Sequence, residues 1–366
     1  MGLHIPLLLT AAIVAGLFWS LVPNVHAVVA HFIAHNPSSA SLLQHHGGSL
    51  RRQQFLLLII SPRSAVMRRE EPMTVRYWTR RRFLFATAGT LATACAPTPV
   101  IAADGPRSLA ALEAKVGGRV GVFALDTGNN RQLAHRPDEL LAMCSTFKWV
   151  LAAAILARVE LAQLSLDERV SYGSTDLLDN APITTRHVAE GFMTIGELTQ
   201  AAVTVSDNTA ANLLLAKLGG PGGFTKFLRS LGDSVTRLDR KEPALNSNDA
   251  GDPRDTTSPR AMVGLMRKIL CGDALSPAGR DRLLGWLRAC ETGKDRLRAG
   301  LPPDWIVGDK TGTGQRGAVN DVAIAWSSGR APILVASYLS DTDAGLNALT
   351  AAQADIGRLV ARGFKS

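Results

Sequence analysis

The chain has 366 residues, of which 46% are hydrophobic and 19% charged, a composition that excludes an intrinsically disordered protein. Its net charge of +9 is unevenly placed. Residues 1–103 hold nine of the 40 basic residues but only two of the 31 acidic ones, so the remainder is nearly neutral, and we expect no nucleic acid as a partner. Six of the eight His also lie in that stretch. This argues against a His-built metal site further along, and we expect neither a metal nor another cofactor.

The first apolar segment runs from Ile5 to Ala34 without a single Lys, Arg, Asp or Glu. It is long enough to span a membrane, so residues 1–66 are interpreted either as an anchor or as an upstream extension outside the natural protein. In the second case translation starts at Met67 or Met73. We favour this later start because the segment that follows is a complete signal by itself. A peptide from residues 1–50 detected in the native host would contradict it.

Residues 67–103 have the order of a secretory signal: an arginine cluster, an apolar run from Phe83 to Ala96, then small residues and prolines. The stretch TRRRFL at residues 79–84 resembles a twin-arginine export signal. We expect cleavage after Ala102 or Ala103, export to the periplasm, and membrane contact through this leader only. The alternative is that Cys95 is a lipoprotein cysteine.

The remaining residues, 104–366, alternate between helical and strand patterns. Apolar spacing predicts a first helix over residues 108–116, with Ser108 as its N-cap. A strand over 119–126, a turn at 127–130 and a returning strand from Arg131 follow. Further helices are predicted at 146–159, 194–205, 209–218, 224–231, 259–270 and 276–290, strands at 304–308, 321–326 and 333–338, and a last helix at 344–364.

This order, with strands at both ends and helices between them, predicts an α+β fold with an inserted all-helical domain. Residues 104–142 and 292–366 would form the α/β domain and residues 143–291 the all-α domain. Short turns between neighbouring strands favour an antiparallel sheet. The glycine cluster at residues 219–223 lacks the strand and the lysine of a phosphate loop, so we interpret it as a connection between two helices.

The four cysteines, Cys95, Cys144, Cys271 and Cys290, show no metal-binding spacing. Cys95 would leave with the leader. We interpret Cys271 and Cys290 as buried free thiols, and a disulfide between them is the alternative.

Ser145 and Lys148 form an S-x-x-K motif at the start of a predicted apolar helix. Such a pair is expected by chance roughly once in a chain of this length. Its significance comes from three motifs that follow in order, namely Ser206-Asp207-Asn208, the EPALN stretch from Glu242 to Asn246, and the KTGT stretch from Lys310 to Thr313. A lysine one helical turn from a serine can reach its hydroxyl, and burial or a nearby cation would lower the lysine pKa enough to make it a base.

In combination these motifs are those of a known family. Residues 104–366 resemble a class A serine β-lactamase along their whole length. The resemblance implies an antiparallel five-stranded sheet flanked by N- and C-terminal helices, with an inserted all-helical domain and the site between them. It also implies that the partner is a β-lactam small molecule, that the activity gives antibiotic resistance, and that the protein is a monomer.

The resemblance assigns four catalytic residues. Ser145 would attack the lactam carbonyl and form an acyl-enzyme, and Lys148 would be its neighbouring amine. Ser206, between Lys148 and Lys310, would pass a proton to the departing ring nitrogen. Glu242 would position the water that cleaves the acyl-enzyme. Whether the Glu or the Lys is the base for acylation is disputed in the family.

The remaining assignments concern substrate binding and the loop around Glu242. Asn246 would help to hold the water, Asn208 would hold the amide side chain of the substrate, and Arg240 and Asp255 would form a partly buried pair that closes the loop. The backbone N–H groups of Ser145 and Thr313 would form an oxyanion hole. Lys310, Thr311, Gly312, Thr313 and Arg296 would line the carboxylate end of the pocket.

Three positions depart from common family patterns. Val319 stands where many members place an arginine, and Arg296 matches the alternative source of that charge. Asn180 occupies the place where the family often has an aromatic at the pocket mouth. Cys144 precedes the nucleophile, and since Gly314 stands where some members have its disulfide partner, we expect Cys144 to be a packing residue.

Two other functions remain open from the sequence: a penicillin-binding D-Ala-D-Ala peptidase, and a sensor domain that stays acylated by β-lactams. Glu242 and Asn246 argue against the peptidase, because such peptidases hydrolyse the lactam acyl-enzyme very slowly. The full set of polar groups argues against the sensor, because a domain that only binds would not need a deacylating water.

Overall fold

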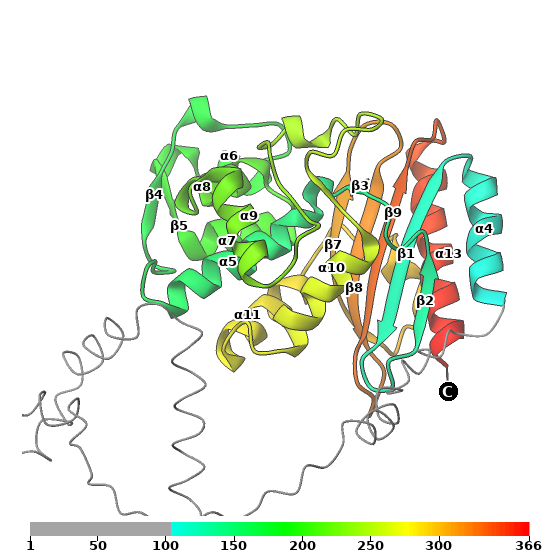
Figure 1. The fold of residues 1–366 in the computed structure, drawn as a ribbon. Coiled ribbons are helices and arrows are strands. Elements are labelled where there is room, and N and C mark those ends of the chain that lie inside the picture. Colours follow the sequence, from blue (N-terminus) through cyan, green and yellow to red (C-terminus); the bar gives the residue numbers. More distant parts are fainter. Residues whose placement is uncertain (1–103, 366) are drawn as a thin grey trace, which may run out of the picture. The chain divides into compact units, whose positions relative to one another are not determined.

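The computed structural model describes residues 104–365, which fall within one compact unit, and the predictions for residues 1–103 lie outside the described residues. No helix in the described part of the chain is long and apolar enough to cross a membrane. At the centre lies an antiparallel sheet with the strand order β2-β1-β9-β8-β7 (Figure 1). Its strands are β1 (Arg119–Asp126), β2 (Gln132–His135), β7 (Ile306–Thr313), β8 (Val319–Trp326) and β9 (Ile333–Ser340). The predicted five-stranded antiparallel sheet is therefore confirmed.

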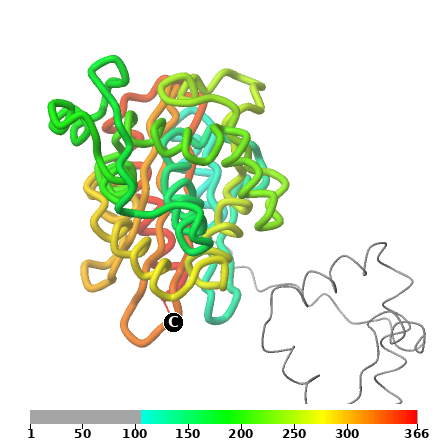
Figure 2. Tube along the Cα trace, turned by 90° about the vertical axis from the view of Figure 1, so that its left-hand side faces the viewer, coloured from blue at the N-terminus to red at the C-terminus, as the bar shows by residue number. Residues whose placement is uncertain are grey.

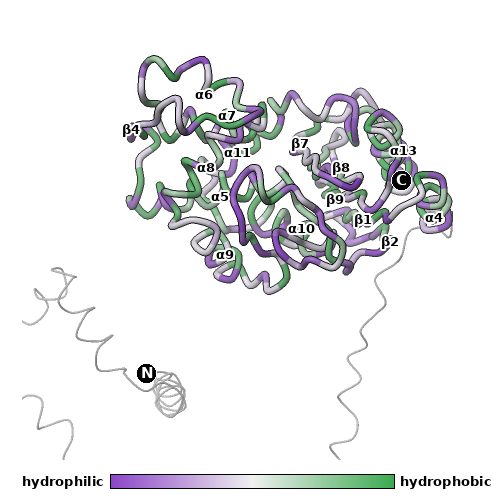
Figure 3. Tube along the Cα trace, turned by 90° about the horizontal axis from the view of Figure 1, so that it is seen from above, coloured by the Kyte–Doolittle hydropathy of each residue, from purple (hydrophilic) through white to green (hydrophobic). Residues whose placement is uncertain are grey.

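The sheet is covered on both faces, and its side chains alternate between two cores. Along β1, Val122 and Ala124 belong to the core formed with α4 (Asp104–Val116) and α13 (Leu346–Phe364), whereas Phe123 and Leu125 belong to the core of the opposite face. Figure 3 shows α4 and α13 together beyond the sheet, on the side away from α5. The short helix α12 (Leu297–Gly300) also packs against α13.

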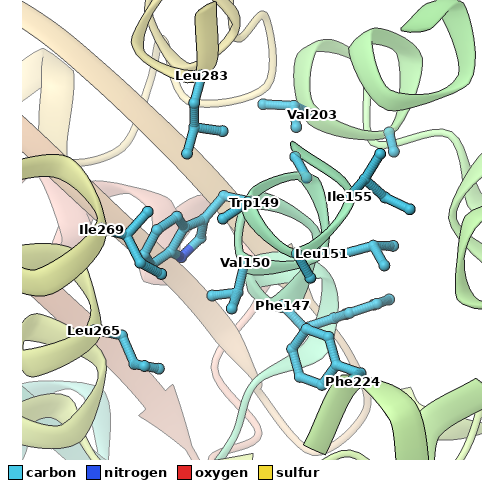
Figure 4. Packing of buried hydrophobic residues seen from close by; sticks show 14 of the residues in the cluster. Phe147, Trp149, Val150, Leu151, Ile155, Val203, Phe224, Leu265, Ile269 and Leu283 are labelled. Carbon is cyan, nitrogen blue, oxygen red and sulfur yellow. The ribbon is translucent and has the colours of Figure 1, made fainter. Parts of the chain in front are cut away.

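The opposite face carries the other helices, which lie in front of the orange strands in Figure 2. They include α5 (Phe147–Glu160), α7 (Ile195–Thr204), α8 (Asn208–Lys217), α9 (Gly220–Ser230), α10 (Pro259–Met266) and α11 (Pro277–Arg288). Helix α5 is buried on all sides from Phe147 to Leu156 and, apart from Lys148, is apolar there; it lies at the middle of this core, where Phe147, Trp149 and Leu151 point toward different neighbours (Figure 4). A helix that is hydrophobic all round must be buried in this way. The division into two domains stays a prediction.

Several element boundaries differ from the sequence-based ones. Helix α4 begins at Asp104, so Ser108 lies inside it and the predicted N-cap is wrong; Pro106 is tolerated because it lies in the first turn. Helix α10 ends at Met266 and continues as a π-helical turn over Arg267–Cys271. The glycine cluster does follow α8, but only Gly219 lies between the helices, because α9 begins at Gly220.

The largest difference concerns β7, predicted as residues 304–308 but extending from Ile306 to Thr313. The KTGT motif therefore lies within the strand and not after it. Its polar residues interrupt the apolar pattern by which a doubly buried strand is recognised. Two short ladders were also not predicted, β3 (Leu141–Ala142) with β6 (Thr256–Thr257) and β4 (Arg169–Ser171) with β5 (Phe192–Thr194).

Candidate active site

Ser145 lies in a 3-10 turn, Cys144–Thr146, that leads directly into α5. The turn packs against β7, the edge strand of the sheet. The approach is so close that a Cβ on Gly312 would lie 2.7 Å from Met143 O and 3.2 Å from Ser145 N. Only glycine allows two backbones to come this near. The glycine at position 312 therefore allows Ser145 to lie beside the strand that carries Lys310.

Glu242 contacts both members of the S-x-x-K motif. Its Oε1 accepts a hydrogen bond from Ser145 Oγ at 3.1 Å and lies 3.0 Å from Lys148 Nζ. Both the Lys148 and Glu242 side chains are fully buried in this ion pair. Ser145 therefore has a carboxylate within proton-transfer distance, and that carboxylate touches the neighbouring amine.

Lys148 is completely enclosed on the inner side of α5. Its Nζ donates to Asn208 Oδ1 at 2.6 Å and to Ser206 O at 2.9 Å, in addition to its contact with Glu242. Burial lowers the pKa of Lys148 below its ordinary value, and the charge of Glu242 opposes this shift. The amine is therefore held among three acceptors while burial lowers its pKa.

Ser206 stands between the two lysines. Its Oγ accepts from Lys310 Nζ at 3.0 Å and lies 3.4 Å from Lys148 Nζ. Burial, together with the charges of Lys148 and Arg296, lowers the pKa of Lys310 to about 8, against an opposing interaction with Cys290. Ser206 has a φ of +63°, a left-handed conformation that non-glycine residues seldom adopt outside constrained sites.

The backbone around Ser206 is held by its neighbour Asp207, which is fully buried. Asp207 Oδ1 caps α8 by accepting from Ala210 N at 2.9 Å. Its Oδ2 accepts from Ile183 N and Thr184 N, both at 3.0 Å, in α6 (Pro182–Arg186). The middle residue of the SDN motif is thus structural, and it fixes Ser206 and Asn208 on either side.

Glu242 lies in a loop of residues 239–255, which we call the Glu242 loop. Asn212 of α8 holds its backbone from one side, since Asn212 Oδ1 accepts from Glu242 N at 3.0 Å and its Nδ2 donates to Glu242 O at 2.9 Å. Asn246 Nδ2 donates to Glu242 Oε2 at 2.6 Å. Asn246 Oδ1 is buried and has no partner among the described residues, so this acceptor fits a water beside the carboxylate.

Arg240 and Asp255 join the two ends of the Glu242 loop. Arg240 Nε donates to Asp255 Oδ2 at 2.5 Å, and the two side chains are 20% and 1% exposed. Asp255 Oδ1 also accepts from the backbone N–H groups of Asp239 and Arg240. Because Asp255 accepts three hydrogen bonds, it holds the two ends of the loop together more strongly than a surface ion pair would.

Arg296 lies behind the free end of β7. Its Nη1 donates to Gly312 O at 2.8 Å and to Asn320 O at 2.6 Å, and its Nη2 donates to Thr313 Oγ1 at 2.7 Å. Burial lowers the pKa of this guanidinium. Thr313 pairs with Val319 in the sheet. The positive charge of Arg296 therefore lies at the end of β7 that is adjacent to Val319.

The free edge of β7 supplies backbone groups to the site. Gly314 N donates to Ala318 O at 2.9 Å, so the N–H of Gly314 points toward the β8 side of the strand. Because hydrogen-bonded and non-hydrogen-bonded pairs alternate in an antiparallel ladder, the N–H of Thr313 points away from β8, toward the free edge. This orientation suits the second donor of an oxyanion hole beside Ser145 N–H.

These groups surround one cavity of about 400 Å³. Its walls come from the Ser145 turn, the SDN loop, the Glu242 loop and β7. The lining residues are Ser145, Asn180, Ser206, Asn208, Asn246, Thr292, Arg296, Thr311, Gly312 and Thr313. The structure thus brings most of the predicted site residues to one place, with Lys148, Glu242 and Lys310 buried behind its floor.

Some residues have contacts that the sequence did not indicate. The Asn208 amide is engaged at both ends, accepting from Lys148 and donating to Asp179 O at 2.8 Å. Asn180, at the cavity wall, donates to Ser206 O at 3.1 Å. Thr292 Oγ1 lies 2.6 Å from Thr311 Oγ1, which adds a hydroxyl to the carboxylate end. No sequence signal distinguished Thr292, or the roles of Asn212 and Asp207, because their partners are distant in the chain.

The three cysteines among the described residues are free thiols. Cys290 is buried as expected, but Cys271 is exposed, so its predicted burial is wrong. Cys144 packs with Ala142 and Ala318 behind the nucleophile. Within residues 104–365 no cluster of His, Cys, Asp or Glu has the arrangement of a metal site.

Comparison with known proteins places this geometry in a family. The model of the beta-lactamase enzyme family matches residues 106–364. The beta-lactamase CTX-M-8 of Citrobacter amalonaticus is 45% identical over 270 residues, which cover 74% of this chain and 92% of that protein. The carbapenem-hydrolyzing beta-lactamase KPC of Klebsiella oxytoca is 48% identical over 230 residues, covering 63% of this chain and 78% of that protein.

Solved structures agree. The ancestral class A beta-lactamase of Gram-negative bacteria superposes with a TM-score of 0.70 at 56% identity, covering 71% of this chain and all of that one (100%). The putative class A beta-lactamase PenP from Rhodopseudomonas palustris has a TM-score of 0.69 at 54% identity, with coverages of 71% and 99%. This chain therefore belongs to the beta-lactamase enzyme family, as a member of class A.

Proposed function

We propose that the protein hydrolyses the β-lactam amide bond of penicillins and cephalosporins through an acyl-enzyme on Ser145, and thereby gives antibiotic resistance. The observation that carries this proposal is the position of Glu242. One carboxylate oxygen contacts Ser145 and Lys148, and the other is held by Asn246. A carboxylate in this position can accept a proton from the serine during acylation and a proton from a water during deacylation.

In acylation, Ser145 Oγ forms a bond to the lactam carbonyl carbon and its proton passes to the Glu242–Lys148 pair, whose atoms lie within 3.1 Å. The carbonyl oxygen becomes an oxyanion that accepts from the N–H groups of Ser145 and Thr313. When the ring C–N bond breaks, the nitrogen takes a proton from Ser206 Oγ, and Ser206 recovers a proton from Lys148, whose amine it contacts. The proton lost by Ser145 thus ends on the ring nitrogen, and Glu242 is again an ionised carboxylate before deacylation.

In deacylation, a water attacks the ester carbonyl carbon and gives a proton to Glu242. Asn246 Oδ1 would accept that water's second hydrogen and so orient its lone pair toward the ester. The ester C–O bond then breaks, Ser145 Oγ recovers a proton, and the ring-opened acid leaves.

The substrate carboxylate would bind at the other end of the cavity. Lys310 and Arg296 supply positive charge there, and the hydroxyls of Thr311, Thr313 and Thr292 supply donors. A buried ammonium and guanidinium attract a carboxylate strongly because little water screens them.

One experiment separates this function from a peptidase or an acylated sensor. The protein is mixed with a chromogenic cephalosporin, and product and protein mass are followed together. Steady turnover with unmodified protein supports hydrolysis. A lasting adduct on Ser145 would support one of the other two functions, and no reaction at Ser145 would contradict all three.

The first testable prediction concerns Glu242→Ala. Without the carboxylate, the acyl-enzyme forms but is hydrolysed at least about a hundredfold more slowly, a loss typical of a missing general base. Mass spectrometry should show the Ser145 adduct accumulating within one turnover. Ser145→Ala, which cannot be acylated, is the control. Undiminished turnover in Glu242→Ala would refute the role given to Glu242.

We also propose that the protein is exported to the periplasm as a monomer, with membrane contact through the leader only. The twin-arginine-like stretch at residues 79–84 and the small residues before Ala103 support this proposal. N-terminal sequencing of the mature protein from periplasmic extracts tests it. A start at Ala103 or Asp104 is expected, and a mature chain retaining residues 1–66 would contradict it.

A further inference from the structure

Asn248 is a buried amide in the Glu242 loop that the catalytic steps above do not use. It follows Asn246 by two positions and is 9% exposed. Its φ of +50° lies in the left-handed region, which Asn tolerates better than most residues with a Cβ. A buried polar side chain in such a conformation needs partners, and its partners lie outside its own loop.

The side chain of Asn248 reaches the loop of residues 314–318, which connects β7 to β8 and which we call the β7–β8 turn. Its Nδ2 donates to Gln315 O at 3.1 Å and contacts Arg316 O at 3.4 Å. The same Nδ2 lies 3.0 Å from Ser340 Oγ, and Ser340 Oγ donates to Asn248 Oδ1 at 3.2 Å. Since the two carbonyl oxygens require a donor, the orientation of the amide is determined by its surroundings.

A second contact joins the same two loops. Gln315 N donates to the backbone oxygen of Asn246 at 2.9 Å. Between these two attachments there is little room, because a Cβ on Gly314 would lie 2.8 Å from Asn246 O. The half of the Glu242 loop that contains Asn246 is therefore attached to the end of β7.

Glu242 is anchored elsewhere. Its backbone N–H and C=O are both bonded to the side chain of Asn212 on α8. Its carboxylate is further held by Lys148 and Ser145. The two groups proposed to hold the deacylating water are bonded to each other, and each also has its own support outside the loop, α8 for Glu242 and the β7–β8 turn for Asn246.

We propose that Asn248 is a positioning residue for deacylation. Its side chain attaches the Glu242 loop to the β7–β8 turn and so keeps Asn246 at the right position relative to Glu242. The proposal rests on the proposed function. It predicts that loss of this tie slows attack of water on the acyl-enzyme. Formation of the acyl-enzyme is spared, since Ser145, Lys148, Ser206 and Glu242 keep their own contacts.

This division has a kinetic signature. For an acyl-enzyme mechanism, kcat/KM reports the steps up to acylation, whereas kcat also contains deacylation. Slower deacylation therefore lowers kcat and KM together and leaves kcat/KM unchanged. A variant that merely folds less well instead has fewer active molecules, so its kcat and kcat/KM fall together while KM stays constant.

The test uses two variants and one control, all in the full chain. Asn248→Gly removes the side chain and accepts the left-handed φ. Asn248→Asp keeps the shape but cannot donate to the carbonyl oxygens of Gln315 and Arg316. The control, Arg316→Asn, removes an exposed side chain on the same turn and retains the carbonyl that Asn248 contacts.

The deacylation rate constant is measured by mass spectrometry after rapid acylation with a slow cephalosporin. It should fall about five- to tenfold in both Asn248 variants, as loss of about one net hydrogen bond predicts, with kcat/KM within twofold of the parent. Arg316→Asn should deacylate like the parent. An unchanged deacylation rate in Asn248→Gly and Asn248→Asp, or a fall in kcat/KM equal to that in kcat, would overturn the proposal.

Amide hydrogen exchange in the free enzyme separates this proposal from the function on which it rests. Peptides covering residues 243–250 should exchange faster in both Asn248 variants than in Arg316→Asn. Unchanged exchange would show that Asn248 is no tie. A failure of Glu242→Ala to accumulate the adduct would instead overturn the proposed function, whatever the exchange experiment shows.

Discussion

At the scale of single residues, the site depends on charged side chains whose pKa values are shifted by burial. Lys310 is fully buried near Lys148 and Arg296, and its pKa is lowered to about 8. A cation surrounded by cations is stable only because Ser206 Oγ and Thr311 O accept its hydrogens. The same surroundings make it a strong binder for a substrate carboxylate.

Activity should therefore decline in alkali. Lys310 is charged below its pKa and neutral above it, so kcat/KM for the free enzyme should fall about tenfold per pH unit above roughly pH 8. Lys310→Arg should move this decline upward by more than one pH unit, because a guanidinium stays charged. The pH profile of kcat/KM measures both. An identical alkaline limb in Lys310→Arg would show that another group causes it.

At Cys144, burial shifts the pKa in the opposite direction from the shift at Lys310. Burial and the charge of Glu242 raise the pKa of its thiol to about 12, so it is protonated and unreactive at neutral pH. Iodoacetamide at pH 8 should label the exposed Cys271 and leave Cys144 unmodified until the protein unfolds. Peptide mapping measures this, with Cys271→Ser as the control. Rapid labelling of Cys144 in the native state would contradict the packing role.

At the scale of elements, the edge strand β7 is the part of the fold on which most of the site depends. Lys310, Thr311 and Thr313 lie on it, and Gly312 lets it touch the Ser145 turn. Its polar residues are also the reason the sequence predicted the strand too short. Strands β1 and β9, whose residues are apolar on both faces, were predicted to within two residues of their ends.

Gly312→Ala tests this dependence. The new methyl group would lie 2.7 Å from Met143 O and 3.1 Å from Cys144 Cβ, so β7 and the Ser145 turn must separate. Overpacking of this kind costs about 1–3 kcal/mol of stability. Acylation should slow by more than about tenfold because Ser145 and Thr313 no longer face one oxyanion. Stopped-flow acylation and urea unfolding measure the two effects.

The control for that substitution is Gly345→Ala. Gly345 precedes α13, and a Cβ there would meet nothing within 4 Å. Its stability and acylation rate should match the parent. If Gly312→Ala also matched the parent, the close approach of the two backbones would have no functional weight.

At the scale of the whole molecule, charged pairs join elements that are far apart in the chain. Glu113 of α4 binds Arg136 through two hydrogen bonds, at 2.5 and 2.8 Å, and also accepts from Val120 N at the start of β1. The Arg136 hydrogen bonds lower the pKa of Glu113 to about 2, against a smaller effect of burial. This group stabilises the folded state only while it is ionised.

The sign of its pH dependence follows. Because the folded-state pKa is depressed, the stabilisation is fully present above about pH 4.5 and is lost as pH falls toward 2. Glu113→Gln should lower the thermal midpoint by about 2–4 °C at pH 7, with the difference shrinking toward pH 2 and in 1 M salt. Asp138→Asn, which breaks an exposed pair with Arg260, should change the midpoint less. A pH-independent difference would contradict the ion-pair explanation.

Sequence and structure agree in an uneven way across the molecule. The order of strands and helices could be predicted from apolar periodicity, which is a local signal. The five-stranded sheet and the assembly of Ser145, Lys148, Ser206, Glu242 and Lys310 could be predicted because the short motifs resemble those of a known family. The contacts of Asn212 with Glu242, of Thr292 with Thr311, and of Asn248 with the β7–β8 turn could not. Each joins polar residues whose partner is chosen only once the chain has folded.

The pairing of β1 with β9 has a consequence for the order in which the protein is made. Arg119 at the start of β1 and Asp341 just after β9 form an ion pair although they are 222 positions apart. During synthesis, Ser145 and Lys148 emerge from the ribosome long before β7, which carries Lys310, and β9, which pairs with β1. Contacts this distant in sequence form slowly, and no truncated nascent chain can hold the complete site. We therefore expect the complete site to form only after β9 has been synthesised, and premature termination before β9 to abolish activity as loss of Ser145 would.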